Sequence, residues 1–259
     1  MTARQLPAVI RLLCVAFLFC LLGGCKGEAP FAQKDGVWHY RTATIAQSDA
    51  ASFRILSDHY AKDRTYVYYG DSYRDGREYY MISHDRVRVV KEADPATFQY
   101  LDQDYARDAR AVFYEGERFA VKDVASFQVL NYGFAKDTQT GYYLRTPIAG
   151  SDGASFTELG DGHHARDKAR AYYCDYASSR VEKGPGVRTT VLRGADPATL
   201  VALELGYAKT PTTVYYRGQP VAGADAPSFE TPGGLAEGVD AKDKNAVYQQ
   251  GRKRAAPAP

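Results

Sequence analysis

Residues 94–114 contain Asp94-Pro95-Ala96-Thr97-Phe98, then Tyr105-Ala106-Arg107-Asp108, then Phe113-Tyr114, and versions of this stretch recur along the chain. The first block has an Asp, then Ser or Thr three residues on, then Phe or Leu. Its six copies begin at Asp49, Asp94, Asp123, Asp152, Asp196 and Asp225. The six copies of the second block begin at Tyr60, Tyr105, Phe134, His164, Tyr207 and Asp240. Such recurrence indicates a repeat protein whose units must stack to bury a core.

The spacing of the first block defines the unit. Its last residues are 45, 29, 29, 44 and 29 residues apart, so the basic unit has 29 residues and two units carry insertions of 16 and 15 residues. Residues 34–40 resemble half a unit and predict an N-terminal cap. We expect five segments: a signal (1–24), a lipidated N-terminus with the cap (25–47), units one to three (48–153), units four to six (154–254) and a disordered tail (255–259).

Each block predicts a local structure. Asp94 suits a helix N-cap and Pro95 the first helical position, which predicts a single helical turn. Tyr105-Ala106-Arg107 alternates with the period of a strand, and Asp108 then opens a turn by hydrogen bonding to its own backbone. The Ala common to all six copies indicates close packing. The predicted fold is all-β with short helical turns, a tandem array of six β-hairpin repeats, and a β-propeller-like closure is the alternative.

The first 24 residues have the features of a secretory signal. Arg4 and Arg11 precede an apolar run of 11 residues, which is too short to span a bilayer. Leu22-Gly23-Gly24-Cys25 resembles the bacterial lipobox, which implies cleavage before Cys25 and acylation of its thiol, for instance by palmitate. The resemblance implies a lipid anchor in the bacterial cell envelope. Lys26 replaces the aspartate of inner-membrane lipoproteins and favours the outer membrane, and an ordinary signal is the alternative.

Charge and cysteine content argue against a nucleic-acid partner and against a disulfide within the mature chain. Lys and Arg number 33 against 31 Asp and Glu, and residues 25–259 contain 31 of each, so we expect no nucleic-acid partner. Cys14 and Cys20 leave with the signal and Cys25 carries lipid, so Cys174 has no partner for a disulfide within the mature chain. We expect it to be an inert, partly buried thiol, and pairing between chains is the alternative.

The repeated pattern resembles the DKNYY repeat family of bacterial envelope proteins, named for a motif close to Asp243-Lys244-Asn245 and Tyr68-Tyr69. The likeness covers residues 33–253, with two departures, Thr210 in place of Asp and His164 in place of an aromatic residue. The resemblance implies an envelope repeat protein and transfers no catalytic residue.

Catalytic and metal-binding motifs are missing from the sequence. It has no Gly-rich phosphate loop, H-E-x-x-H, C-x-x-C or G-x-S-x-G. His163 and His164 are adjacent, so they point to opposite faces of a strand and do not chelate together. The repeated aspartates fit caps and turns, because catalysis requires one tuned pair in a cleft. We expect no catalytic residue, no cofactor and no metal site.

The tyrosines and the insertions are the candidate binding features. Adjacent strand residues point to opposite faces, so one tyrosine of each pair is expected to be exposed, where a row of rings could stack on sugars. The insertions, about residues 70–91 and 174–188, are rich in Tyr and Arg, and departures from a repeat often form its binding face. The candidate partner-binding residues are Tyr73, Arg74, Arg77, Tyr79, Tyr80, Arg86, Tyr176 and Arg180.

These features predict a lipid-anchored, non-enzymatic module that binds an envelope protein. Binding of peptidoglycan or another glycan through exposed tyrosines is the alternative, and purely structural long hairpins would give the insertions no role in binding.

Overall fold

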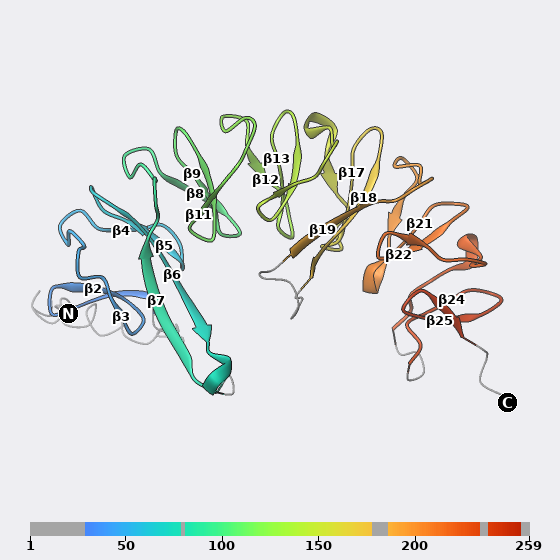
Figure 1. The fold of residues 1–259 in the computed structure, drawn as a ribbon, viewed down its shortest axis with the longest axis horizontal. Coiled ribbons are helices and arrows are strands. Elements are labelled where there is room, and N and C mark those ends of the chain that lie inside the picture. Colours follow the sequence, from blue (N-terminus) through green and yellow to red (C-terminus); the bar gives the residue numbers. More distant parts are fainter. Residues whose placement is uncertain (1–28, 79–80, 178–185, 234–237, 255–259) are drawn as a thin grey trace, which may run out of the picture.

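The computed structural model describes residues 29–78, 81–177, 186–233 and 238–254, which form an open arc of small antiparallel sheets (Figure 1). Seven sheets follow one another along this part of the chain, and in each sheet consecutive strands are neighbours. The first and last sheets lie at opposite ends of the arc, so the described residues do not adopt the propeller-like closure. The signal, Cys25 and the tail lie outside the described residues.

The first four sheets are the cap and units one to three. The cap contains β1 (Phe31–Lys34), β2 (Val37–Tyr40) and β3 (Ala43–Thr44). Unit one contains β4 (Arg54–Ile55), β5 (Tyr60–Lys62), β6 (Val67–Arg74) and β7 (Ser83–Val89), with the 3-10 turn η1 (Gly76–Glu78) after β6. Unit two contains β8 (Gln99–Asp102), β9 (Tyr105–Arg107), β10 (Val112–Tyr114) and β11 (Glu117–Phe119). Unit three contains β12 (Gln128–Val129), β13 (Phe134–Lys136), β14 (Gly141–Tyr143) and β15 (Thr146–Pro147).

The last three sheets are units four to six. Unit four contains η2 (Gly153–Ser155), β16 (Thr157–Glu158), β17 (His164–Arg166), β18 (Ala171–Ala177) and β19 (Gly186–Val191). Unit five contains β20 (Val201–Ala202), η3 (Glu204–Gly206), β21 (Tyr207–Lys209), β22 (Val214–Tyr216) and β23 (Gln219–Pro220). Unit six contains η4 (Ala226–Ser228), β24 (Ala241–Lys242), β25 (Val247–Gln249) and β26 (Arg252–Arg254).

The predicted all-β array of repeats is confirmed, and each complete unit is larger than a hairpin. The second block and the aromatic residues after it pair as expected, for example Ala106 with Phe113. Two further strands, β8 and β11 in unit two, extend this hairpin to a sheet of four strands. These outer strands have two to four residues in units two and three, too few to give a recognisable hydrophobic period in the sequence.

The first block forms a 3-10 turn in units four and six, as predicted, and a hydrogen-bonded turn without a helix in the other units, including Asp94 to Phe98. In η2 the Asp152 carboxylate accepts a hydrogen bond from the backbone N–H of Ser155 (3.0 Å), and in η4 Asp225 does the same for Ser228 (3.2 Å). This is N-cap geometry, as expected from the residue types. A single turn of this kind is too short to be stable alone and depends on its contacts with the sheet.

The core lies between neighbouring sheets. The Ala of the second block is fully buried in all six units, at Ala61, Ala106, Ala135, Ala165, Ala208 and Ala241. Beside it, two aromatic residues pair across the strands and face the next unit. Tyr60 with Tyr69 and Tyr105 with Tyr114 have ring centroids 4.9 and 4.7 Å apart. In unit six the same two positions hold Asp240 and Gln249.

The expectation that one tyrosine of each pair is exposed is wrong for units one, three and four, and in unit five Tyr216 is half-buried. Tyr68 and Tyr69 are 0% and 3% exposed, and Tyr172 and Tyr173 are 0% and 1% exposed. The two side chains do leave the strand on opposite faces, but in a stack each face is covered by a neighbouring unit. Tyr69, for example, lies against the backbone of Gly116, where an added Cβ would be 2.7 Å from the Cβ of Tyr69.

Candidate interaction surface

The second-block aspartate holds each unit together. In unit three, Asp137 is 3% exposed and accepts hydrogen bonds from the Tyr142 hydroxyl (2.7 Å), from the N–H groups of Gln139 and Thr140 (2.7 Å each) and from the N–H of Asp123 in the first block (2.9 Å). Burial alone would raise the pKa of Asp137, but these hydrogen bonds outweigh it, so the pKa lies below its usual value. The aspartate therefore joins the helical turn, the hairpin turn and a core tyrosine.

The same contacts recur in other units. The carboxylate accepts from the first-block aspartate N–H at 2.7–2.9 Å in units one, two, four and six, through Asp63, Asp108, Asp167 and Asp243. Unit five departs, because the shorter Thr210 accepts from amides of its own turn, Thr212 and Thr213, at 3.4 and 3.1 Å. The hydroxyl of Tyr215 donates instead to the backbone carbonyl of Arg193 (3.1 Å).

The other residues of the second block connect a unit to the next one. The Tyr60 hydroxyl accepts from the N–H of Gly116 (2.7 Å) and donates to the carbonyl of Asp104 (3.2 Å). Lys62 donates to the carbonyls of Pro95 and Phe98 in the next helical turn, both at 2.9 Å. Equivalent bonds from the basic side chain are made by Arg107, Lys136, Arg166 and Lys209. The residues of the two repeated blocks thus hold each unit together and join it to the next, and we call this set of contacts the repeat framework.

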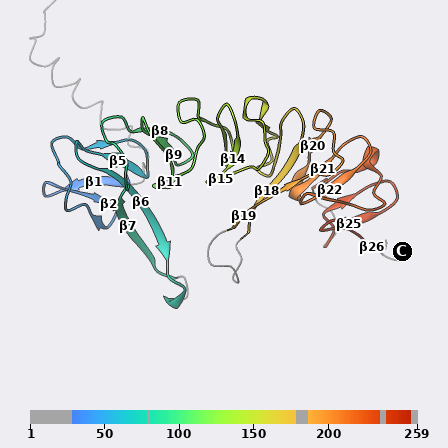
Figure 2. The ribbon, with the colours of Figure 1, turned by 45° about the horizontal axis from the view of Figure 1, so that its top comes forward.

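The two insertions are long hairpins that replace a two-residue turn. Unit two turns between β10 and β11 through Glu115-Gly116, both with positive φ, whereas β6–β7 and β18–β19 continue beyond the same point. Both long hairpins project from the concave side of the arc (Figures 1 and 2). We refer to residues 70–89 as hairpin one and to residues 174–191 as hairpin two.

Each long hairpin has an Asp–Arg pair at the same place in its register. Arg86 donates to both carboxylate oxygens of Asp71 (2.6 and 2.7 Å), and Arg188 donates to Asp175 (2.7 Å). Burial raises the pKa of Asp71, but the bonds to Arg86 and its charge outweigh this, so the pKa is lowered. Each aspartate is the second residue after the tyrosine pair, a regularity that the sequence could have shown.

Hairpin one is also braced against the cap. Asp85 accepts hydrogen bonds from the hydroxyl of Ser72 within the hairpin (2.6 Å) and from the hydroxyl of Thr42 after β2 (2.7 Å). The base of the hairpin is therefore fixed to the cap. Its outer part extends beyond this brace (Figure 2).

The outer part of hairpin one combines a held ring with exposed apolar side chains. Tyr73 is 43% exposed, stacks on His84 (centroids 5.3 Å apart) and lies under the guanidinium of Arg86 (5.1 Å). Met81 and Ile82, just before β7, are 86% and 53% exposed. The sequence interpretation overlooked these two, although an apolar pair in a strongly charged insertion is a detectable signal.

The structure locates five of the eight candidate partner-binding residues. Tyr73, Arg74, Arg77 and Arg86 lie in or beside hairpin one, with Arg77 bound to Asp75 (2.6 Å). Tyr176 lies in hairpin two and is 51% exposed. Tyr79, Tyr80 and Arg180 lie outside the described residues. The candidates of the two hairpins thus occupy one side of the arc but two separate projections.

His164 and the free cysteine belong to the core, whereas His163 is half-buried. His164 is fully buried, its Nδ1 lies 2.6 Å from Asp161, and its ring packs on Tyr173 as the first tyrosine does elsewhere. Cys174 is fully buried and not partly buried as expected, and burial raises the pKa of its thiol to about 12, which favours an inert thiol. The described residues contain no group of three His, Cys, Asp or Glu side chains that could hold a metal ion.

Comparison with known proteins gives one match. The sequence model of the DKNYY family matches residues 71–146, from hairpin one to β15, and this supports the repeat family suggested by the sequence. No curated protein and no solved structure matches the chain.

Proposed function

We propose that this chain is a non-enzymatic protein-interaction module of the bacterial cell envelope, and that hairpin one contacts the partner. The exposed group of Tyr73, Met81 and Ile82 carries the proposal. Scattered apolar residues are normal on a surface, but these lie together on a projection that the stacking of units does not require.

The geometry of Tyr73 favours binding. Its ring contacts both His84 and Arg86, so little conformational entropy is lost when a partner covers it. Tyrosine and arginine are also the residues that most often dominate the binding energy of interfaces. The brace at Asp85 keeps the base of the projection in place.

Site-specific photocrosslinking in cells tests this proposal. A photoreactive phenylalanine analogue at Tyr73 or Met81 should give a discrete crosslinked product. With the analogue placed at Arg74 instead, the product should be lost when Tyr73→Ser, Met81→Ser and Ile82→Ser are combined. The matched control is Tyr66, which is 40% exposed but lies in a short turn of the same unit. No product from Tyr73 and Met81, or equal products from Tyr66, would contradict the proposal.

The lipid anchor is proposed from the signal and Cys25. Among the described residues, no helix is long and apolar enough to cross a membrane. A Cys25→Ala variant should leave the membrane fraction or remain unprocessed. Unchanged fractionation would contradict the anchor, which on this proposal lies in the outer membrane.

Binding of peptidoglycan stays the alternative and has less support, because most of the paired tyrosines are buried between units and Tyr216 is half-buried. It would depend on exposed tyrosines such as Tyr73 and Tyr176, which are 43% and 51% exposed and lie on the two hairpins. Co-sedimentation of residues 26–259 with purified sacculi, compared with a Tyr73→Ala, Tyr176→Ala variant, tests it. No sedimentation of the folded domain would exclude this alternative.

A further inference from the structure

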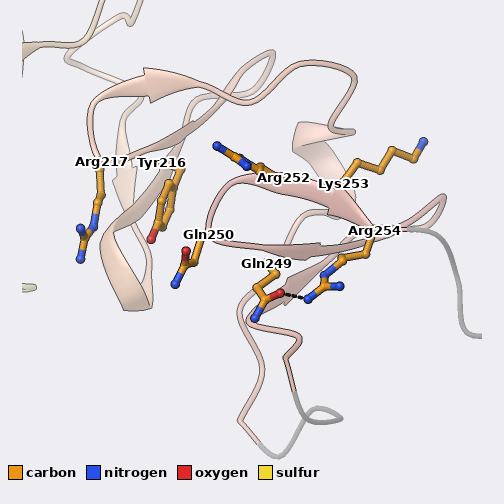
Figure 3. A pocket seen from close by; sticks show the side chains of 7 residues that line it. All are labelled: Tyr216, Arg217, Gln249, Gln250, Arg252, Lys253 and Arg254. Atoms are coloured by element: carbon orange, nitrogen blue, oxygen red, sulfur yellow. Dashed lines mark hydrogen bonds between the residues drawn. The ribbon is translucent and has the colours of Figure 1, made fainter.

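A groove with a strongly positive lining lies at the C-terminal part of the concave side. One hollow of about 680 Å³ is lined by Tyr216, Arg217, Gln249, Gln250, Arg252, Lys253 and Arg254 (Figure 3). A second hollow shares Tyr216, Arg217, Gln250 and Arg252 with it and extends to Arg188 and Thr190 of hairpin two. The two hollows therefore form one elongated groove across units four, five and six, which we call the basic groove.

The charge of the basic groove is unbalanced. Its described lining contains five cationic side chains, Arg188, Arg217, Arg252, Lys253 and Arg254, and no carboxylate. Arg188 is bound to Asp175, and no ion pair joins the other four to an acidic side chain among the described residues. The chain is close to neutral overall, so this local excess of positive charge is a property of the groove. Such a surface attracts an anionic ligand.

One wall of the groove is an open sheet edge. The hairpin β25–β26 turns through Gln250-Gly251, so Gln249 and Arg252 form its closing hydrogen-bonded pair. The next residue, Lys253, therefore directs its backbone N–H and C=O away from β25, and no other described strand pairs with β26. The corresponding positions in units three and five are Pro147 and Pro220, which have no N–H to donate. Unit six keeps the donor at Lys253, as unit two does at Arg118, and of these two Lys253 lines the basic groove.

We propose that the basic groove binds an extended acidic segment of a protein partner, which adds as a strand to β26. The elongated shape suits a linear chain, the arginines pair with Asp and Glu side chains, and the edge at Lys253 supplies main-chain hydrogen bonds. Among the described residues that line the groove, Tyr216 is the single aromatic side chain, so the lining offers few stacking positions for nucleic acid bases. This inference takes from the proposed function only the assumption that the acidic segment belongs to a protein partner.

Fluorescence anisotropy of a labelled octaglutamate peptide at low ionic strength tests the charge recognition. We expect salt-dependent binding to residues 26–259 that is weakened by about tenfold or more in an Arg217→Ala, Arg252→Ala variant. The matched control is Arg54→Ala, Arg64→Ala, which removes the same charge from unit one and should preserve the affinity. Absence of binding, or equal weakening in the control, would overturn the proposal. Tighter binding of phosphatidylglycerol vesicles through the same arginines would overturn it too.

Two substitutions at Lys253 test the addition of a strand. Lys253→Gln removes the charge, whereas Lys253→Pro removes both the charge and the N–H, at a position where units three and five already accommodate proline. We expect the proline variant to bind octaglutamate several-fold more weakly than the glutamine variant, with the same thermal unfolding. Equal affinities would show that the edge is not used.

The two proposals fail independently. Octaglutamate binding does not require hairpin one. If octaglutamate binds but Tyr73 and Met81 give no crosslinks, the proposed function is contradicted and the proposal for the basic groove still stands. Crosslinks from Tyr73 and Met81 without octaglutamate binding would contradict the groove alone.

Discussion

The repeat framework and hairpin one use the same residue types for different ends. In the framework, Asp137 is 3% exposed and accepts several hydrogen bonds at once, so each bond depends on the others. In hairpin one, Asp71 and Arg86 form an ion pair whose side chains are 24% and 53% exposed. Buried bonds to a charged group contribute far more to stability than exposed ion pairs. The comparison teaches that stability resides in the framework, while the projections can vary.

Acid should have the largest effect, because it acts on the second-block aspartates of four units at once. The pKa values of Asp63, Asp137, Asp167 and Asp243 are lowered from 3.8 in the folded chain. Their contribution to stability is present above the unfolded pKa and is lost as the pH falls through the folded values. Urea unfolding should therefore show a midpoint that is flat above about pH 5 and falls steeply below about pH 4. A midpoint that does not fall would contradict this account.

Removal of one such aspartate should have the next largest effect. Asp137→Ala leaves several buried donors unpaired and should lower the free energy of unfolding by about 3 kcal/mol or more. Asp123→Ala is the matched control, since that carboxylate accepts from Ser126 and Thr138 near the surface, and it should cost about 1 kcal/mol. Equal costs in denaturant titrations would remove the distinction between the two aspartates.

The contact between units can be tested through a glycine. Gly116 has φ +71° and lies against Tyr69, so Gly116→Ala combines backbone strain with a clash and should destabilise by about 2 kcal/mol. Gly36 has φ +80° but no atom within 4 Å of the added Cβ, so Gly36→Ala isolates the strain, about 1 kcal/mol. Thermal unfolding of both variants measures the difference, and the interpretation fails if Gly36→Ala costs as much.

Unit five lacks the second-block aspartate, and restoring this aspartate should stabilise the protein. Thr210→Asp gives unit five an acceptor for the N–H of Asp196 and the hydroxyl of Tyr215, so it should stabilise by about 1 kcal/mol. The measurement is the free energy of unfolding, and Thr210→Asn, which has the shape without the charge, is the control. A destabilised Thr210→Asp variant would show that the neighbouring turn cannot adjust.

Hairpin one should matter least to stability. Tyr69 and Arg88 are register partners, and Val90 donates to Val67 two residues away, so Tyr69 and Arg88 are also a hydrogen-bonded pair that a two-residue turn can close. The same alternation makes Tyr73 and His84 a hydrogen-bonded pair, so replacement of residues 74–83 by Asn-Gly keeps Asp85 and Val87 in contact with the cap and should change the free energy of unfolding by about 0.5 kcal/mol or less. A larger loss would assign hairpin one to the framework.

The sequence predicted the local structures well because each depends on short-range chemistry. The aspartate turns, the caps and the buried Ala follow from residue types within one unit. The burial of Tyr69 was predicted wrongly, because the alternation of a strand does not tell what covers each face, and in this stack the next unit covers it. The basic groove was missed since Arg188, Arg217 and Arg252 are far apart in the sequence and meet only through the regular step between units.

The change from an aromatic pair to Asp240 and Gln249 makes unit six different from the units before it. The Tyr207 hydroxyl donates to the Asp240 carboxylate (2.8 Å) and accepts from the N–H of Gly251 (2.7 Å), so unit six packs on unit five in the usual way. Gln249, however, stands where Tyr69 and Tyr114 present a ring to the following unit. The described array therefore has polarity, like a filament whose two ends differ in chemistry: every earlier unit covers its follower with an aromatic side chain, and unit six presents an amide.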